Sequence, residues 1–455
     1  MTTTYRSTNG SHRGVSLGTA LLTGQAPDRG LYLPEQIPTF TPRQLDDLRD
    51  RPYAHVAAEV LLRYTTGLIS EPSLRKLCDE IYDFDVPIER VGMGRQYLLR
   101  LDRGPTASFK DFAARMMGRL LGRLVREQRQ ELIILTATSG DTGSAVAQAF
   151  HGVEGVRVVV LFPVDEVSER QRKQMTTLGG NISTLAMRGK FDDCQALVKQ
   201  AFADPALSGL PLSSANSINI GRLLPQSAYY VYAATRVAAP GEPVVFSVPS
   251  GNFGNLVGGL LAKRMGVPVD RFVVATNAND EVPVWLATGD YHKIEPSREC
   301  LSNAMNVGHP SNLARLIDLY GGQMDHTGLI TKQPDADALR RDLWATSVDD
   351  DTTRATITKL WRDWRVLVEP HGAVGWAGLQ RYLESPDAKQ GLPCISLETA
   401  HPAKFPIPVQ EQAGVDPELP ASLQGLTLLQ EHSTDMDIDY ETFRTWLLDT
   451  HGARA

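Results

Sequence analysis

The stretch LIILTATSGDTGSAVAQAFHGVEGVRVVVLF, residues 132–162, decides the fold class of this chain. Two runs rich in aliphatic and β-branched residues, 132–136 and 157–162, enclose a Gly-containing turn and a segment at 144–150 that suits a helix. Strand, turn, helix and strand in this order predict a βαβ unit with parallel strands. Ligands of such sheets bind at the carboxyl ends of the strands, where the turns lead into helices.

The same alternation continues along the chain and predicts an α/β fold with a mostly parallel sheet. We expect helices at 168–178, 191–202 and 256–265 and further strands at 182–186, 244–248, 271–276 and, as the last strand, 394–397. Residues 1–92, with their Pro-punctuated loops, are predicted to form an N-terminal module. Residues 93–410 then form the catalytic region, and residues 411–455 a helical C-terminal appendix.

The composition is that of an ordinary soluble globular protein, with 455 residues, 42% of them hydrophobic and 22% charged. The net charge of −7 argues against a nucleic-acid partner, because such proteins normally carry a basic face. No apolar stretch approaches the roughly 18 residues of a membrane span, and the polar N-terminus is unlike a signal peptide. The four cysteines form no CxxC pair, so we expect no metal site and a cytoplasmic protein with reduced thiols.

A lysine in GPTASFKDFAAR, residues 104–115, is the candidate nucleophile. Lys110 lies at the predicted start of a helix, where the helix dipole disfavours a positive charge. A lowered pKa frees the amine, and a neutral amine is what Schiff-base formation with a carbonyl requires. An ordinary surface lysine in a first helical turn is the alternative interpretation of this segment.

Two Gly-containing turns between strand and helix are candidate anion sites. The turn at 139–143, SGDTG, offers hydroxyls and backbone N–H groups at a helix N-terminus, although a simple capped helix explains it equally well. The turn at 251–255, GNFGN, permits tight curvature and brings amide donors, so we expect a phosphate cup there. Its weak dinucleotide-type pattern lacks a suitably placed acidic residue, which makes an NAD-dependent enzyme the weaker reading.

The segment SLETAHPAKF, residues 396–405, follows the last predicted strand and places Thr399, His401 and Lys404 close together. A hydroxyl at the end of a strand can meet a pyridine nitrogen, and Thr399 is placed for that role. A histidine beside a proline is more often structural than catalytic. Together these features predict an α/β enzyme with one Schiff-base lysine and two anion cradles, which suits pyridoxal 5'-phosphate (PLP) chemistry.

Ten motifs in sequence resemble the threonine synthase family, in its longer microbial and fungal branch. They include GPTASFKDFAAR, TATSGDTGSAV, SANSINIGRLLPQ, VPSGNFGNLVGG, LSNAMNVGHPSN, EPHGAVG and TAHPAKF. The resemblance implies the fold-type II PLP fold, related to tryptophan synthase β, with two α/β subdomains. It also implies that O-phospho-L-homoserine and water are converted to L-threonine and phosphate, by a monomer or homodimer.

The resemblance also implies roles for individual residues. Lys110 would bind the cofactor as a Schiff base and then act as general acid and base on the substrate. Thr399 would meet the pyridine nitrogen, and Asp141 the O3′ side of the cofactor. The expected phosphate cup consists of Gly251, Asn252, Phe253, Gly254 and Asn255. The expected substrate-binding residues are Ser139, Gly140, Thr142, Asn216, Asn219 and Arg222.

Three residues depart from the family pattern. Ser108 stands where alanine is expected, Asn306 where aspartate is expected, and Glu398 where a small residue is expected. Asn306 removes a charge near the expected site wall, and Glu398 adds one near the pyridine end. Lineage drift explains such changes, and the alternative is altered substrate choice in a specialised-pathway paralogue. Two further rivals are a phospho-lyase that releases 2-oxobutyrate, ammonia and phosphate, and a non-catalytic binding protein.

Overall fold

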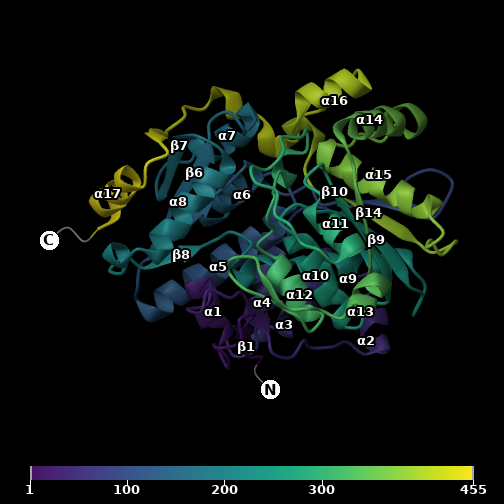
Figure 1. Cartoon of the computed structure of the whole chain (residues 1–455), viewed down its shortest axis with the longest axis horizontal. Helices are drawn as coiled ribbons and strands as arrows, with labels where there is room; N and C mark the ends of the chain where they lie inside the picture. The colour runs from purple at the N-terminus through teal and green to yellow at the C-terminus, as the bar shows by residue number, and fades with distance from the viewer. Residues whose placement is uncertain (1–2, 453–455) are drawn as a thin grey trace.

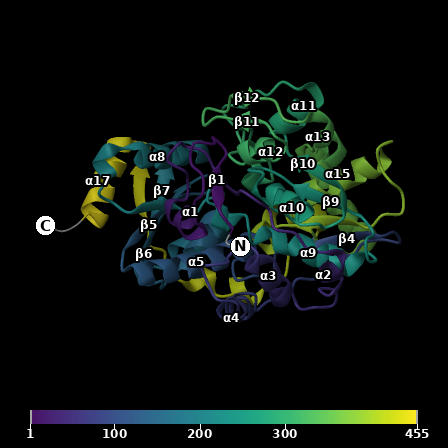
Figure 2. The same cartoon turned by 90° about the horizontal axis from the view of Figure 1, so that it is seen from below.

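Two separate sheets form the framework of the computed structural model, which describes residues 3–452. Figure 1 shows them in two lobes, one with β6, β7 and α8 and the other with β9, β10 and β14. The N-terminal helices lie beneath both lobes and come to the front when the molecule is viewed from below (Figure 2). Within residues 3–452, no helix combines the length and the apolar character needed to cross a membrane.

The first lobe contains a five-stranded sheet in the order β15-β7-β6-β5-β8, with every pair parallel. Its strands are β5 (Leu132–Ala137), β6 (Val156–Pro163), β7 (Ile182–Arg188), β8 (Leu212–Ser214) and β15 (Thr434–Asp437). Its helices are α5 (Lys110–Gln128), α6 (Asp141–Phe150), α7 (Glu169–Thr176) and α8 (Phe191–Ala203). All six residues of β5 are buried, as expected of a parallel strand covered by helices on both faces.

The second lobe contains a six-stranded sheet in the order β13-β10-β9-β14-β4-β3, in which only the β3–β4 pair is antiparallel. Its strands are β3 (Ile88–Arg90), β4 (Gln96–Arg100), β9 (Val244–Pro249), β10 (Val269–Thr276), β13 (Leu343–Ser347) and β14 (Cys394–Glu398). The helices around it are α9 (Gln226–Val237), α10 (Gly254–Arg264), α11 (Glu281–Thr288), α14 (Asp350–Trp364) and α15 (Pro370–Glu384). The α/β class and the mostly parallel sheets are therefore confirmed.

The remaining elements surround these lobes. The N-terminal ones are β1 (Tyr5–Ser7), α1 (Leu17–Thr23), β2 (Tyr32–Pro34), α2 (Pro42–Asp46), α3 (Tyr53–Leu62) and α4 (Glu71–Ile81). The later ones are α12 (Leu313–Leu319), β11 (Gln323–Met324), β12 (Ile330–Lys332), α13 (Ala336–Asp342), α16 (Pro406–Ala413) and α17 (Tyr440–His451). Short 3-10 helices are η1 (Pro205–Leu207), η2 (Ile220–Arg222), η3 (Asn303–Met305), η4 (Pro402–Lys404), η5 (Ala421–Leu423) and η6 (Leu426–Leu428).

The N-terminal module is joined to the rest through an aromatic cluster rather than a linker. The ring of Tyr53 in α3 packs edge-on against Phe112 of α5 and Tyr232 of α9, with centroids 5.1 and 5.4 Å apart. Such pairs add to the burial energy of each ring by about 0.5–1.5 kcal/mol. The module is thereby packed against the first helix of the catalytic region, which begins at Lys110.

Two features of the fold differ from the sequence-based expectation. The strand at 394–397 is not the last one, because β15 pairs in parallel with β7 inside the predicted helical appendix. Two of its four residues, TDMD, are aspartates, which are depleted in strands, so this strand depends on its tertiary pairing. The proposed module boundary after residue 92 falls between β3 and β4, which pair with each other in one sheet.

Candidate active site

The site lies where strands of the six-stranded sheet end. Strands β9 and β14 are parallel neighbours, so the segments that follow them lie side by side. The turn at 251–255 follows β9, and Thr399 directly follows β14. The carbonyl of Thr399 accepts a hydrogen bond of 2.9 Å from the Phe109 backbone N–H. This bond brings Lys110, the next residue, beside the ends of both strands.

A short loop fixes the position of Lys110 at the start of α5. The Asp111 carboxylate accepts hydrogen bonds from the Thr106 backbone N–H at 2.9 Å and from its hydroxyl at 2.6 Å. Ala107 adopts a left-handed φ of 53°, which is uncommon for a residue with a side chain. The loop is therefore held by the residue after the lysine, and its unusual backbone is typical of functional sites.

The Lys110 amine faces a carboxylate from the other lobe. Its Nζ lies 3.4 Å from Oδ2 of Asp141, the first residue of α6, and its side chain is 14% exposed. The other Asp141 oxygen, Oδ1, lies 2.6 Å from Nζ of Lys404, a side chain with no exposed surface. Gln171 of α7 also donates to Oδ1, at 2.9 Å. One carboxylate thus lies between two lysines.

Burial and charge shift the pKa values of these groups. Burial lowers the pKa of Lys110, and the positive charges of Lys404 and Arg222 lower it further, while Asp141 acts in the opposite direction. Burial opposes ionisation of Asp141, but Lys404, Lys110 and His371 together hold its pKa below the usual range. Burial also lowers the pKa of the Arg222 guanidinium, to about 10. The site is therefore set up to hold an ionised Asp141 beside a lysine that loses its proton readily.

Neutral groups build the turn at 251–255. Phe253 adopts a left-handed φ of 60°, and Gly254 then begins α10. The Asn252 side chain donates to the Ser217 hydroxyl at 3.0 Å and accepts from the Ser311 backbone N–H at 2.7 Å. The Asn312 side chain donates to the Asn252 carbonyl at 3.0 Å. The turn is thereby fixed from two separate segments of the chain, at 217 and at 311–312.

The turn at 251–255 also has features that suit an anionic ligand. The amide oxygen of Asn255 accepts hydrogen bonds from the hydroxyls of Tyr229 and Tyr230, at 2.5 and 2.7 Å. Its amide nitrogen is buried and has no hydrogen-bond partner within the described residues. The first N–H groups of α10 likewise have no acceptor inside the helix, which favours an anion at that end.

The turn after β5 places the other predicted residues on the opposite side. Gly140 has a φ of 125°, where a side chain would be strained, and its backbone N–H donates to the Thr138 hydroxyl at 2.9 Å. Thr142 lies in the first turn of α6, directly after Asp141. Ser139 lines a small cavity between the lobes, together with Glu166, Phe191, Ser297, Glu299, Asn303 and Asn306. The predicted wall residue Asn306 therefore shares this cavity with Ser139.

The three residues predicted from the motif SANSINIGR differ in how many of their hydrogen-bonding groups are free to bind a ligand. Asn219 is fully buried, and its amide donates to the carbonyls of Leu21 and Ser214 while its oxygen accepts from Gly221. Both its donor hydrogens are thus used inside the protein. Asn216 donates to the Ala137 carbonyl at 2.8 Å. Arg222 donates to the Ala215 carbonyl, and its Nε has no partner within the described residues.

Glu398, one of the three departures from the family pattern, lies against the start of α15. Its carboxylate accepts from the Glu369 backbone N–H at 3.0 Å and faces the start of α15. Burial, with the nearby Glu369 charge, raises the pKa of Glu398 well above its usual value. Burial therefore works against a charge on this carboxyl, although the nearby Arg100 acts in the opposite direction.

Two residues of the site were missed or left without a role by the sequence analysis. Gln171 contacts Asp141 through a position in a polar helix that carries no motif, so no signal marked it. Lys404 was noted only for its closeness to Thr399, although it contacts the same carboxylate as Lys110. His401 has the structural role expected of a histidine beside a proline, because its Nδ1 accepts from the Ala403 N–H at 3.1 Å.

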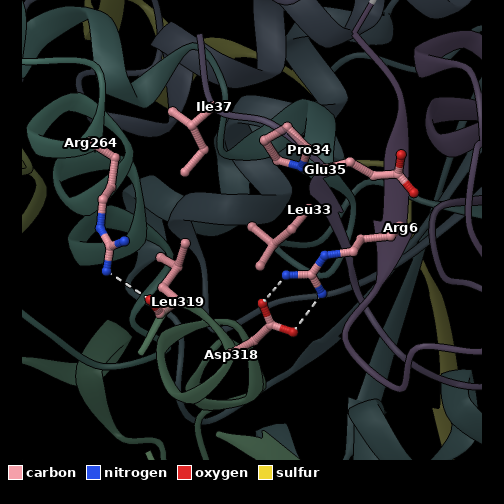
Figure 3. Close-up of a pocket in the computed structure, with 8 residues that line it drawn as sticks. All are labelled: Arg6, Leu33, Pro34, Glu35, Ile37, Arg264, Asp318 and Leu319. Atoms are coloured by element: carbon pink, nitrogen blue, oxygen red, sulfur yellow. Dashed lines mark hydrogen bonds and ion pairs between the residues drawn. The ribbon is translucent and has the colours of Figure 1, made fainter. Parts of the chain in front are cut away.

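A larger hollow lies elsewhere and contains none of the predicted site residues. It has a volume of about 330 Å³ and lies between the N-terminal segment and α12 (Figure 3). Arg6 in this hollow makes two hydrogen bonds with Asp318, at 2.8 and 2.7 Å. Arg264 donates to the Leu319 carbonyl at 2.7 Å. Both guanidinium groups are thus engaged within the protein.

Comparison with known proteins agrees with this geometry. The family described as pyridoxal-phosphate dependent enzyme matches residues 86–396, and the families described as threonine synthase N terminus and threonine synthase, C-terminal match residues 4–82 and 372–446. A threonine synthase of Escherichia coli (strain K12) is 38% identical, over 96% of this chain and 97% of its own. One of Pseudomonas aeruginosa is 37% identical, over 94% and 95%. The crystal structure of PLP-bound threonine synthase from Brucella melitensis covers both chains fully, at 34% identity and a TM-score of 0.90.

The two-lobed parallel architecture and these matches make the chain a PLP-dependent lyase of fold type II, with PLP as its cofactor. The unpartnered amide nitrogen of Asn255 and the N-terminus of α10 fit the phosphate end of that cofactor. Within this class, the long matches at 37–38% identity decide the family. The chain belongs to the threonine synthase family.

Proposed function

We propose that this chain converts O-phospho-L-homoserine and water to L-threonine and phosphate, with Lys110 as the residue that binds PLP. The observation that carries this proposal is the position of the Lys110 amine. Its side chain is only 14% exposed, its Nζ faces Asp141 at 3.4 Å, and it lies one residue from the Phe109–Thr399 hydrogen bond. The relatives named threonine synthase at 37–38% identity support the choice of substrate.

The charge distribution supports an anionic cofactor and an anionic substrate. Asp141 lies between Lys110 and Lys404, and the Arg222 guanidinium adds a further positive charge near Lys110, so cationic groups outnumber this carboxylate. A phosphate group and a substrate carboxylate would both offset that excess. When bound, PLP supplies the aldehyde for a Schiff base and the electron-withdrawing ring.

Lys110 then moves protons. We infer that its amine takes the proton from the substrate Cα and transfers protons at Cβ, because burial lowers its pKa and so favours the neutral, basic form. Asp141 holds that amine in place from the other lobe. Ser139, Gly140 and Thr142, around the N-terminus of α6, are proposed to bind the substrate carboxylate.

Three of the remaining predicted residues keep a proposed role. Thr399 is proposed to meet the pyridine nitrogen, because it lies beside Lys110 at the end of β14. Arg222 and Asn216 remain candidates for the substrate side. We leave Asn219 out of the substrate-binding set, since its amide is fully engaged within the protein.

The proposed reaction has one direct test. The purified chain is incubated with O-phospho-L-homoserine and PLP, and phosphate, amino acids and 2-oxo acids are measured. Equal amounts of phosphate and threonine are expected. Release of 2-oxobutyrate and ammonia would instead identify the phospho-lyase, and no phosphate release would favour another substrate or a binding protein.

Replacing the lysine tests its role. Lys110→Ala should abolish both the visible absorbance of the Schiff base and turnover, because the other lysine of the site, Lys404, is held by Asp141 and the Thr106 carbonyl. Circular dichroism checks that the variant is folded. The matched control is Lys389→Ala, an exposed lysine paired with Asp270 outside the site. Full activity in Lys110→Ala would show that the assignment is wrong.

We further propose that the enzyme works in the cytoplasm. All four cysteines, Cys78, Cys194, Cys300 and Cys394, are free thiols, and three of them are buried. Such thiols persist in a reducing compartment.

A further inference from the structure

The site contains a second lysine that the proposed function does not use. Lys404 lies on η4, directly after the segment that contains Thr399, and its side chain is completely buried. Its amine has two polar neighbours, Asp141 Oδ1 at 2.6 Å and the Thr106 carbonyl at 3.0 Å. Lysine is almost never fully buried unless it is paired. Lys404 therefore has a specific partner, and that partner is the carboxylate that also faces Lys110.

The two lysines share this carboxylate unequally. Asp141 Oδ1 lies 2.6 Å from Lys404, whereas Oδ2 lies 3.4 Å from Lys110. Gln171 adds a third hydrogen bond at 2.9 Å, on the side of Lys404. Because Coulomb attraction rises as distance falls, the negative charge of Asp141 stabilises the positive charge of Lys404 more than that of Lys110. Lys110, the less compensated amine, is the one expected to give up its proton.

We propose that Lys404 is a positioning residue. It forms the closer ion pair with the Asp141 carboxylate, and this leaves Lys110 as the neutral, nucleophilic amine. This inference rests on the function proposed above, in which Lys110 forms the Schiff base. In that step the Lys110 nitrogen bonds to the aldehyde carbon, and the carbonyl oxygen leaves as water together with both amine hydrogens. A protonated amine cannot take this step because it has no free electron pair.

The electrostatics of the site point in the same direction. The positive charge of Lys404 is one of the causes that lower the pKa of Lys110, after burial. Removing that charge raises the pKa of Lys110 in two ways. A repelling charge is lost, and Asp141 becomes the partner of Lys110 alone. A neutral residue that only anchored the loop through the Thr106 carbonyl would have no such effect.

The test measures how fast the apoenzyme forms the Schiff base with PLP, as a function of pH. The rate is followed by the absorbance of the Schiff base, and its midpoint reports the pKa of the Lys110 amine. In Lys404→Met the midpoint is expected to rise by about one unit or more, which lowers the rate near pH 7 about tenfold. Lys389→Met, an exposed lysine paired with Asp270, is the matched control and should keep the wild-type midpoint.

A second background keeps the test valid if Lys404→Met alone does not fold. Asp141→Asn removes the carboxylate and should lower the midpoint below that of the wild type, because Lys404 then acts on Lys110 without opposition. Adding Lys404→Met to Asp141→Asn replaces the buried ion pair by neutral groups, a change that proteins often tolerate. The double variant should have a higher midpoint than Asp141→Asn. No rise in either background would overturn the inference.

Borohydride reduction followed by peptide mapping separates this inference from the proposed function. Labelling of Lys110 in the wild type supports its role as the PLP-binding residue, whatever Lys404 does. Labelling of Lys110 with an unchanged midpoint in both Lys404 backgrounds would refute the positioning role alone. Absence of label at Lys110 would refute the proposed function as well.

Discussion

The turns after β5 and after β9 have the same local form and opposite chemistry. Each follows a buried parallel strand, contains glycine and leads into a helix. The first turn presents Asp141, whose carboxylate contacts two lysines and Gln171. The second presents Asn252 and Asn255, which hydrogen-bond only to neutral groups. The same strand–turn–helix motif can therefore present either a charged carboxylate or neutral amide groups, depending on the residues that pack against it.

The difference also indicates that the two turns have different roles in binding the cofactor. A carboxylate in the first turn repels an anion unless cations offset it, and here Lys404 lies at 2.6 Å. The second turn needs no such offset, because amide and backbone N–H groups attract an anion directly. We therefore expect the cofactor phosphate at the turn after β9 and the reacting amine near the turn after β5.

The largest effect is expected from removing the fixed charge. Asp141→Ala leaves Lys404 fully buried without a counter-ion, which should cost about 3–5 kcal/mol of unfolding free energy. Asn255→Ala in the neutral turn removes the acceptor shared by the hydroxyls of Tyr229 and Tyr230, but each keeps a second acceptor, so the loss should be about 0.5–1.5 kcal/mol. Denaturant unfolding measures both. If Asn255→Ala lost as much unfolding free energy as Asp141→Ala, or more, the proposed difference between the two turns would be wrong.

A third turn, between β10 and α11, sharpens the comparison, because its carboxylate has no partner. Glu281 is buried, and neither of its carboxylate oxygens has a hydrogen-bond partner within the described residues. Burial, with the nearby Asp280, raises its pKa from 4.5 to about 7, while Arg298 acts in the opposite direction. The folded state therefore favours the neutral carboxyl.

The sign of the resulting pH dependence follows from that raised pKa. The stabilising contribution of Glu281 is complete below about pH 4.5 and is lost as the pH rises through 7. Over that window the wild type should lose on the order of 3 kcal/mol relative to Glu281→Gln, which cannot ionise. Melting temperatures at pH 5 and pH 8 test this. The melting temperature of the variant, relative to that of the wild type, should be higher at pH 8 than at pH 5. The same difference in melting temperature at both pH values would contradict the expectation.

The smallest effect is expected from two glycines of the neutral turn. A Cβ at Gly251 would lie 2.7 Å from Met305 Cα, a backbone atom, whereas a Cβ at Gly254 would lie 3.3 Å from Ser217 Cβ. Gly251→Ala must shift the turn, at about 1–3 kcal/mol, and should weaken PLP binding by about tenfold or more. Gly254→Ala is the matched control with a smaller loss. Titration of each apoenzyme with PLP measures the affinity, and a stronger effect at Gly254 would argue against a fixed cradle.

Much of the fold could be predicted because local patterns carry it. The runs at 132–136, 157–162 and 244–248 are strands in the structure, since continuous apolar stretches bounded by turn residues are typical of buried parallel strands. The helix that begins at Lys110 was predicted at the same residue. Strand β15 could not be predicted, because its residues form a strand only through pairing with β7.

By itself the sequence determined the class of fold, the two Gly-containing turns and the lysine that begins α5. These features depend on residues close together in the chain, so sequence patterns can predict them. Only the tertiary structure decided that Lys404 and Lys110 share Asp141, that Asn219 is engaged within the protein, and that Glu398 contacts the start of α15. Such partners come from distant segments, and burial and distance decide their charge and reactivity.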